Sequence, residues 1–360
     1  MAGATVRLLV GTHKGGFMLT SDAARSSWAL SGPFFAGADV HHLMLDTRTT
    51  PTLWACVNNG WFGPGLGYSH DFGASWGQPT QGLRFAEGGT RAVERAWVVT
   101  PGTRHGELFA GVDPAALFRS EDTGFSWSEV GALAAHRTRD QWNPGFGGLM
   151  VHSIAPHPTD AARMHVGVSA GGTFESRDGG ASWEPRNAGV LADFAPEPYP
   201  EAGQCVHHLE RDPHDADVLY QQNHCGVYRS DDAGASWVDI SDGLPARFGF
   251  PIIVHPSERG TIYVVPESAA EHRTTPEGRF AVWRSRDRGE HWERCDRGLP
   301  SDGAYLHVYR QATAVDACDE PALYVGTSTG QLFASLDAGD SWRLVRDHLP
   351  PIYSVEAAVV

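Results

Sequence analysis

An eight-residue pattern, S-x-D-x-G-x-S-W, recurs along the chain and limits the possible folds more than any other feature. It occurs at 69–76, 120–127, 176–183, 230–237 and 335–342, and a sixth copy at 285–292 has His291 in place of the second serine. A worn seventh copy at 20–28 has one extra residue and lacks the glycine. Successive complete copies begin about 50–56 residues apart, the length of one four-stranded propeller blade.

Each part of the pattern has a structural role. The aspartate carboxylate accepts hydrogen bonds from backbone N–H groups and closes a tight turn. The glycine takes backbone angles that a side chain forbids, and the tryptophan covers the turn with a large apolar ring. The repeat is therefore predicted to stabilise the fold, and no single copy is predicted to be catalytic.

The pattern resembles the Asp-box (BNR) repeats of sialidases, sortilin-like receptors, xyloglucanases and photosystem II assembly factors. The resemblance covers essentially the whole chain, and it implies a β-propeller. It implies little about function, because one fold hosts many chemistries.

We therefore predict one all-β domain over residues 1–360, a seven-bladed β-propeller with four antiparallel strands in each blade. The segment 6–12 matches the second strand of a blade, whereas 353–360 matches a first, innermost strand. The C-terminal strand is predicted to complete blade 1, which closes the ring without an exposed sheet edge.

Composition narrows the function. The formal net charge of −15 disfavours nucleic acids and anionic membranes as partners. The sequence has no apolar run long enough to span a membrane, and no signal peptide is recognised. Five cysteines in 360 residues indicate reduced thiols rather than a disulfide framework. These features predict a soluble, cytoplasmic protein with a small-molecule partner and leave its oligomeric state open.

The tetrapeptide VHHL occurs twice, at 40–43 and 206–209, and 150–154 is a near relative. In a propeller, the starts of the inner strands lie close to the axis, on the face that also carries the loops between the second and third strands. Aligning the inner strands gives one residue per blade at this position: Glu356 or Tyr353, His41, Arg95, His152, His207, Phe250 and His307, for blades 1 to 7 in order.

Imidazoles that converge from separate strands are suitable ligands for a transition metal. We predict that His41, His152, His207 and His307 bind one metal ion, with Fe, Zn, Cu and Mn all compatible. The metal-free alternatives are a polar pocket and histidines that fill the channel. Glu94 and Glu356 are expected to hold the outer ring nitrogens of the ligands, and together with Arg95 they form the candidate catalytic set.

Other side chains at this face are expected to line a small-molecule pocket. The candidate substrate-binding residues are His13, Asn58, Trp61, Trp142, Asn223 and His224. Aromatic walls are expected from Phe62, Phe146, Phe194 and Tyr199, and a carboxylate or phosphate site from Arg91, Arg95 or Arg139. Cys205 is expected opposite Cys225, as two buried thiols, a labile disulfide or part of the metal environment.

Three functions follow from these expectations. The favoured one is a metal-dependent enzyme that acts on a small molecule by hydrolysis, lyase chemistry or oxygen activation. A non-catalytic scaffold of the assembly-factor type is the alternative. A sialidase-like glycoside hydrolase is disfavoured, because the Arg-Ile-Pro segment usual in the first blade is missing and the inner strands of blades 2, 4 and 5 start with histidine instead of arginine.

Overall fold

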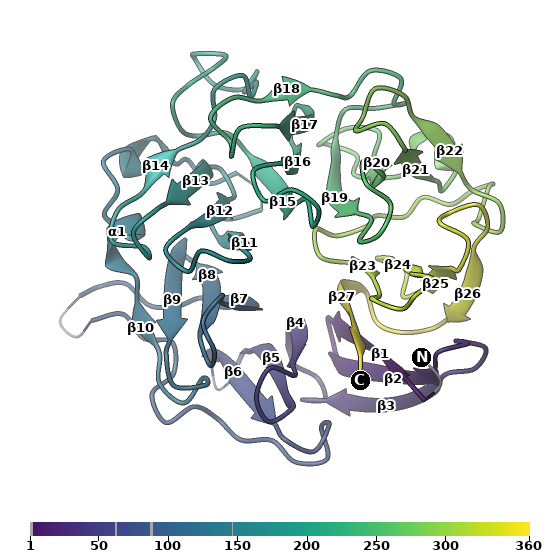
Figure 1. Cartoon of the computed structure of the whole chain (residues 1–360), viewed down its shortest axis with the longest axis horizontal. Coiled ribbons are helices and arrows are strands. Elements are labelled where there is room, and N and C mark those ends of the chain that lie inside the picture. The colour runs from purple at the N-terminus through teal and green to yellow at the C-terminus, as the bar shows by residue number, and fades with distance from the viewer. Residues whose placement is uncertain (1–2, 62, 87–88, 146) are drawn as a thin grey trace.

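The computed structural model describes residues 3–61, 63–86, 89–145 and 147–360, and its sheets form a ring around a central axis (Figure 1). Seven antiparallel sheets follow one another around the ring in chain order, which confirms the predicted seven-bladed β-propeller. Six sheets have four strands. In blade 2 the described residues form three strands, and a bridge between Tyr68 and Gly77 stands in place of the fourth.

The first four blades are built as follows, from the axis outward. Blade 1 contains β27 (Ile352–Val359), β1 (Thr5–Thr12), β2 (Gly15–Asp22) and β3 (Ala29–Phe34). Blade 2 contains β4 (Asp39–Asp46), β5 (Thr52–Asn59) and β6 (Gly63–Ser69). Blade 3 contains β7 (Arg95–Pro101), β8 (Leu108–Asp113), β9 (Ala116–Ser120) and β10 (Ser128–Glu129). Blade 4 contains β11 (Val151–Pro156), β12 (Met164–Val168), β13 (Gly172–Ser176) and β14 (Glu184–Pro185).

The remaining blades follow the same order. Blade 5 contains β15 (Val206–Arg211), β16 (Leu219–Asn223), β17 (Gly226–Ser230) and β18 (Val238–Asp239). Blade 6 contains β19 (Gly249–Val254), β20 (Ile262–Pro266), β21 (Val282–Ser285) and β22 (Glu293–Cys295). Blade 7 contains β23 (Thr313–Val315), β24 (Leu323–Gly326), β25 (Leu332–Ser335) and β26 (Arg343–Arg346). The described helices are α1 (Gly131–Ala134), η1 (Arg139–Gln141) and η2 (Pro276–Gly278), and none of them is long and apolar enough to cross a membrane.

The ring closes where the two ends of the chain meet. Strand β27 pairs antiparallel with β1, from Val6 opposite Val359 to Thr12 opposite Ile352. Figure 1 shows the C-terminal strand lying along the inner side of the N-terminal sheet. The predicted closure of blade 1 by the C-terminal strand is confirmed.

The repeated pattern forms the turn that its residue types predict. In the copy at 69–76, the Ser69 hydroxyl donates a hydrogen bond of 2.7 Å to Asp71 and accepts one of 2.7 Å from the Gly73 N–H. The Asp71 carboxylate accepts the Ser75 N–H at 2.8 Å. These bonds, those from Ser75 first, lower the pKa of Asp71 to about 2. The pattern therefore stabilises the turns, as expected.

A β-bulge near the start of the inner strand recurs in six blades. In blade 5 the pairing register shifts between Val206 and His208, so that His207 has no partner on β16. A bulge inserts one extra residue and re-aims its side chain. The equivalent positions, which we call the bulge ring, are Tyr353, His41, Trp97, His152, His207 and Phe250, in blades 1 to 6.

The bulge ring confirms most of the sequence alignment and corrects two positions. His41, His152, His207 and Phe250 occupy the expected place. In blade 3 the equivalent residue is Trp97, because the bulge lies two residues beyond Arg95. In blade 7, His307 lies ahead of the inner strand β23 and not at its start. In blade 1 the position is taken by Tyr353, one of the two residues expected there, whereas Glu356 pairs regularly with Leu9.

Candidate functional site

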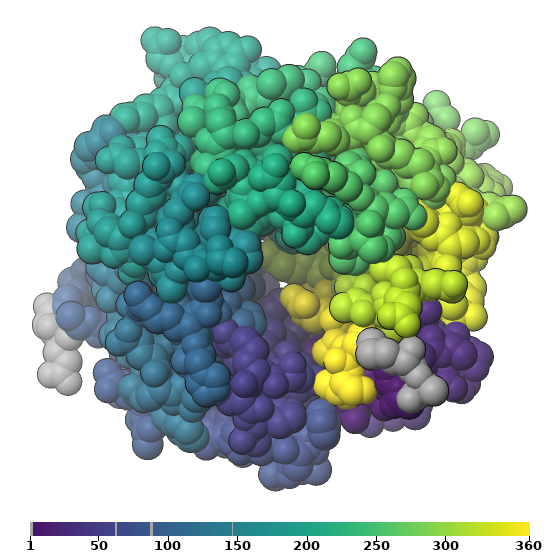
Figure 2. All heavy atoms as spheres, in the orientation of Figure 1, coloured from purple at the N-terminus to yellow at the C-terminus, as the bar shows by residue number. Residues whose placement is uncertain are grey.

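Two adjoining cavities lie at the end of the axis where the inner strands start. The first, of about 250 Å³, is lined by Tyr309 and Tyr353 among others, and we call it the tyrosine cavity. The second, of about 320 Å³, contains Cys205, and we call it the cysteine cavity. Both are bounded by Gly147, Phe250, Arg273 and Arg310. Figure 2 shows the molecular surface hollowed at the centre of the ring.

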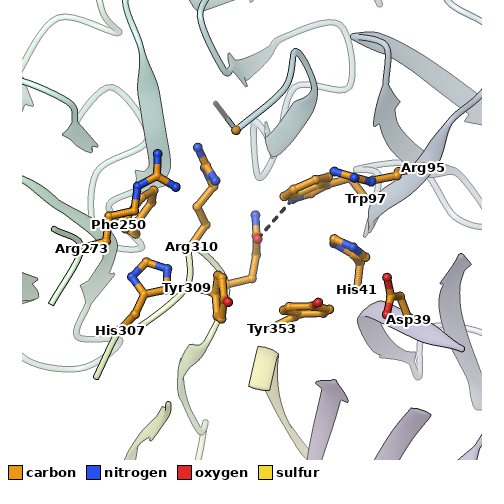
Figure 3. Close-up of a pocket in the computed structure, with 12 residues that line it drawn as sticks. Asp39, His41, Arg95, Trp97, Phe250, Arg273, His307, Tyr309, Arg310 and Tyr353 are labelled. Atoms are coloured by element: carbon orange, nitrogen blue, oxygen red, sulfur yellow. Dashed lines mark hydrogen bonds between the residues drawn. The ribbon is translucent and has the colours of Figure 1, made fainter. Parts of the chain in front are cut away.

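The structure does not gather the four predicted ligand histidines. Figure 3 shows His41 and His307 on opposite sides of the tyrosine cavity, with Tyr309 and Tyr353 between them. His152 uses both ring nitrogens elsewhere, at 2.9 Å from Ser153 Oγ and 2.9 Å from the Val206 carbonyl. Among the described residues, no three of the four bring their ring nitrogens within 4.8 Å of one another.

A different group does converge, in the cysteine cavity. The ligand atoms of Cys205, His207 and His224 all lie within 4.8 Å of one another, and we call these residues the triad. His207 is buried, whereas Cys205 and His224 are partly exposed to the cavity. No other set of three or more His, Cys, Asp or Glu side chains in the described chain meets this condition.

The bulge at His207 creates the triad. Without it, counting along the β15–β16 ladder would place Cys205 opposite Cys225, as the sequence predicts. The bulge shifts the pairing by one residue, so that Val206 lies opposite Asn223, and the His224 N–H donates to the Cys205 carbonyl at 3.0 Å. Cys205 and Cys225 are both free thiols, and the Cys225 thiol donates to the Asp193 carboxylate at 3.2 Å.

Hydrogen bonding prepares His207 to act as a ligand. Its Nδ1 lies 2.6 Å from the Gly249 carbonyl, which can only accept, so Nδ1 carries the proton and Nε2 keeps its lone pair. Burial, assisted by the charge of Arg310, lowers the pKa of His207 well below its usual range. The ring is therefore neutral at physiological pH, the form that binds metals.

The thiol of Cys205 is protonated in the metal-free protein. Burial raises its pKa, although the positive charge of Arg310 acts in the opposite direction. Burial likewise lowers the pKa of His224, which leaves that ring neutral. A metal bound here would therefore displace one proton, from the thiol.

The tyrosine cavity holds a second prepared histidine. His307 Nδ1 lies 2.6 Å from Glu267 Oε1, and the same oxygen accepts the Val308 N–H at 3.2 Å. Glu267 is fully buried, and its Oε2 has no hydrogen-bond partner among the described residues. A histidine oriented by a carboxylate in this way is suited to proton transfer.

His41 lies between two aromatic rings instead of facing the triad. Its ring centroid is 4.8 Å from Tyr353, in a stacked arrangement, and 4.6 Å from Trp97. Burial, with the charge of Arg95 next in importance, lowers the pKa of His41 to about 3. The following residue, His42, pairs with Glu356 at 3.0 Å.

Three arginines line the cavities without a carboxylate partner. Arg95, Arg273 and Arg310 form no ion pair or hydrogen bond with any carboxylate of the described chain, although their neighbours Asp39 and Glu267 pair with histidines. The guanidinium carbons of Arg310 and Arg273 lie 4.9 and 5.6 Å from the ring centroid of Phe250. Burial lowers the pKa of Arg310 to about 10, so it stays charged at neutral pH.

The predicted catalytic set is dispersed. Arg95 lines the tyrosine cavity. Glu94 is exposed and lines neither cavity. Glu356 holds His42 rather than one of the four predicted ligands, because its position three residues beyond the bulge at Tyr353 places it farther along the channel, beside His208 and Glu210.

The predicted substrate-binding residues lie in different parts of the structure. His224 belongs to the triad, and His13 lies at the rim, 2.7 Å from Asp39. Asn58 exchanges two hydrogen bonds with the Ala96 backbone and so joins blades 2 and 3. The remaining three do not line either cavity: Trp61 is 93% exposed, Trp142 packs in the core of blade 4, and Asn223 is buried.

Of the other predicted aromatic and basic residues, only some line a cavity. Phe194 lines the cysteine cavity, whereas Tyr199 is exposed and away from it. Phe62 and Phe146 lie outside the described residues. Arg91 pairs with Glu129, and Arg139 stacks on Trp142, so neither faces the cavities.

Sequence reasoning missed Trp97, Gln311, Arg273 and Arg310 as residues of the site. A signal existed for two of them. Counting back 25 or 26 residues from the repeat aspartate reaches Trp97 from Asp122 and Gln311 from Asp337, just as it reaches His207 from Asp232. Gln311 indeed lines the tyrosine cavity, and its Oε1 accepts the Trp97 indole N–H at 3.3 Å.

Comparisons with known proteins address the fold alone. No protein-family model matches the chain, and neither does any curated protein. Among solved structures, an ancestral GH74 enzyme is 17% identical with a TM-score of 0.56, over 89% of this chain and 38% of that one. YCF48 bound to D1 peptide is 14% identical with a TM-score of 0.53, over 85% and 82% of the two chains.

A third solved structure matches this chain over nearly its full length. Apo AztD from Citrobacter koseri is 13% identical with a TM-score of 0.56, over 99% of this chain and 98% of that one. The GH74 enzyme is much longer, since this chain spans 38% of it. At these identities the three neighbours support the fold of this chain and carry no information about its function.

Proposed function

We propose that the axial mouth is a metal-dependent active site for a small molecule, with the metal held by Cys205, His207 and His224. The observation that carries the proposal is the mutual approach of these three ligand atoms to within 4.8 Å at the wall of a cavity. This ligand set replaces the four histidines expected from the sequence and keeps one of them, His207.

The residues fit a transition metal in chemistry as well as position. One thiolate and two imidazoles suit Zn²⁺, with Cu and Fe as alternatives, whereas Mn, also expected from the sequence, prefers oxygen ligands. The outer nitrogen of His207 is already held by the Gly249 carbonyl, as is usual for metal-binding histidines. Three protein ligands are the number typical of catalytic zinc sites, whereas structural zinc sites have four, so a metal held here would be able to bind a further ligand.

A bound metal would supply Lewis acidity, or a water ligand of lowered pKa, to a molecule in the cavity. The protein itself supplies the apolar wall of Phe250 and Phe194, the charges of Arg273 and Arg310, and the Glu267–His307 pair across Phe250. A cavity of about 320 Å³ is large enough for a small metabolite. A neighbour bound to a peptide does not favour a scaffold role for this chain, because that likeness shows the fold alone.

The test is metal analysis of tag-free protein and of matched variants. Wild type, after incubation with Zn²⁺, Fe²⁺, Cu²⁺ or Mn²⁺ and gel filtration, should retain about one equivalent of one of these ions, and His224→Ala or Cys205→Ser should retain under about 0.1 equivalent. His41→Ala and His307→Ala are the controls and should retain the wild-type amount. Equal loss in these controls would instead support the four-histidine site, and wild type without metal would refute both.

A further inference from the structure

The charges around Phe250 are unbalanced. Arg310 and Arg273 approach the same aromatic ring, which stabilises both cations. Arg273 Nε also donates a hydrogen bond of 3.1 Å to the Ala270 carbonyl. Arg310 Nε is buried without a hydrogen-bond partner among the described residues. The proximity of Arg273 also contributes to lowering the pKa of Arg310, so the two cations repel each other.

None of the described carboxylates near the cavities forms an ion pair with these two arginines. Glu267 accepts hydrogen bonds from His307 and Val308, and Asp39 lies 2.7 Å from His13. Glu271 lines the cysteine cavity but makes no ion pair with a described arginine. In a chain of net charge −15, two close arginines that lack a carboxylate partner indicate a position kept for an anion from outside.

The space beside the arginines fits an organic anion rather than a free ion. Arg310 and Arg273 bound both cavities, so a group held between them can extend into either one. On one side the extension meets Phe194, Ala170 and the triad, and on the other Tyr309 and Trp97. Gly147 permits this arrangement, because a Cβ there would lie 3.3 Å from Arg310 Nη2.

We infer that Arg310 and Arg273 bind the carboxylate or phosphate group of a small organic molecule whose apolar part lies against Phe250. This inference extends the proposed function, since the anion would lie in the cavity that holds the metal. The planar guanidinium groups match the paired oxygens of either anion, and hydrogen bonds between charged groups are about twice as strong as neutral ones. The substrate class is thus a small organic oxyanion, presented by the arginines to the triad.

Calorimetric titration with four probes tests the inference: benzoate, phenyl phosphate, inorganic phosphate and the neutral isostere benzamide. Wild type should bind benzoate or phenyl phosphate more tightly than inorganic phosphate, and benzamide should bind at least about tenfold more weakly than benzoate. The preferred probe of the first two identifies the anion as carboxylate or phosphate. Preference for benzamide, or no saturable binding of any probe, would overturn the inference.

Variants assign the binding to the arginines. Arg310→Gln and Arg273→Gln should each weaken binding of the preferred probe at least about tenfold, and Arg310→Lys should restore part of it. The matched control is Arg139→Gln, since Arg139 also stacks on an aromatic ring, Trp142, and also lacks a carboxylate partner, but lies outside both cavities. Thermal melting of each variant establishes that it is folded, and wild-type affinity in a folded Arg310→Gln and Arg273→Gln would overturn the assignment.

Each titration is run on chelator-treated protein and on metal-loaded protein. Arginine-dependent anion binding without any metal uptake would refute the proposed metal site and leave the anion site standing. Metal uptake together with anion binding that neither arginine substitution weakens would refute the anion site and leave the proposed metal site standing.

Discussion

Blades 2 and 5 begin their inner strands with the same four residues, yet the two histidines at the bulge have different surroundings. In blade 5, His207 stacks on Phe250 and also faces Cys205 and His224. In blade 2, His41 stacks on Tyr353 and contacts Trp97. The tetrapeptide and its bulge therefore fix where the imidazole lies, and the neighbouring residues decide what it can do.

The deciding residues lie at equivalent positions of the two hairpins. Asp39 stands where blade 5 has Cys205, and Asn58, which pairs with Asp39, stands where blade 5 has His224. Asp39 is taken by His13, and Asn58 by the Ala96 backbone. These two positions thus distinguish the proposed metal ligands of blade 5 from the aspartate and asparagine of blade 2 on the same frame.

The largest expected effect comes from removing residues 353–360, which affects both regions. The truncation takes away most of β27, and with it the stacking partner of His41 and the closure of the ring. Loss of the strand exposes the buried edge of β1, so we expect loss of cooperative thermal unfolding or a melting temperature lower by well over 10 °C. Unchanged melting behaviour would show that closure does not depend on β27.

A narrower change places two residues of the blade 2 hairpin at the equivalent positions of blade 5. The double variant Cys205→Asp and His224→Asn gives the His207 hairpin the aspartate and asparagine found in the His41 hairpin. We expect metal affinity to fall by more than about 100-fold, since loss of a mere outer partner already costs 10- to 100-fold. Competition with a chromophoric chelator measures this. The matched variant Tyr353→Ala alters only the blade 2 side and should leave the affinity within about threefold of wild type.

The smallest expected effect is the contribution of His41 to the pH dependence of the free energy of unfolding. The folded protein keeps this ring neutral down to a pKa of about 3, whereas an unfolded chain protonates it near 6.5. Between these values the unfolded state binds more protons, so the free energy of unfolding falls as the pH falls, by up to about 1.4 kcal/mol per pH unit for this one group.

Urea unfolding of wild type and His41→Gln between about pH 6 and 4 measures this slope. The variant should lose up to that share of the pH dependence, whatever its stability at neutral pH. The control is His348→Gln, at a position where the side chain is 90% exposed, and its slope should match that of wild type. Identical slopes for all three proteins would mean that His41 is protonated in the folded state.

The fold was predictable because its signal is repeated. Each S-x-D-x-G-x-S-W copy carries its own turn chemistry, and seven copies at one spacing define the number of blades. The matching ends of the chain, 6–12 and 353–360, likewise predicted how the ring closes, because strand pairing needs only local patterns.

The site was only partly predictable because it depends on register. The sequence predicts His207 as a metal ligand and His224 as a substrate-binding residue. It places Cys205 opposite Cys225 and leaves open whether Cys205 belongs to the metal environment. One bulged residue, His207, shifts the ladder by one and brings Cys205 and His224 together instead. Arg273 and Arg310 reach Phe250 from loops that the repeat does not define, so no pattern in the sequence joins them.

X-ray absorption spectroscopy of the metal-loaded protein tests the central claim most directly. The triad predicts one sulfur ligand at about 2.3 Å and two imidazole nitrogens at about 2.0–2.1 Å for bound zinc, with the sulfur signal lost in Cys205→Ser. A spectrum with four imidazole nitrogens and no sulfur, unchanged in Cys205→Ser, would contradict the account.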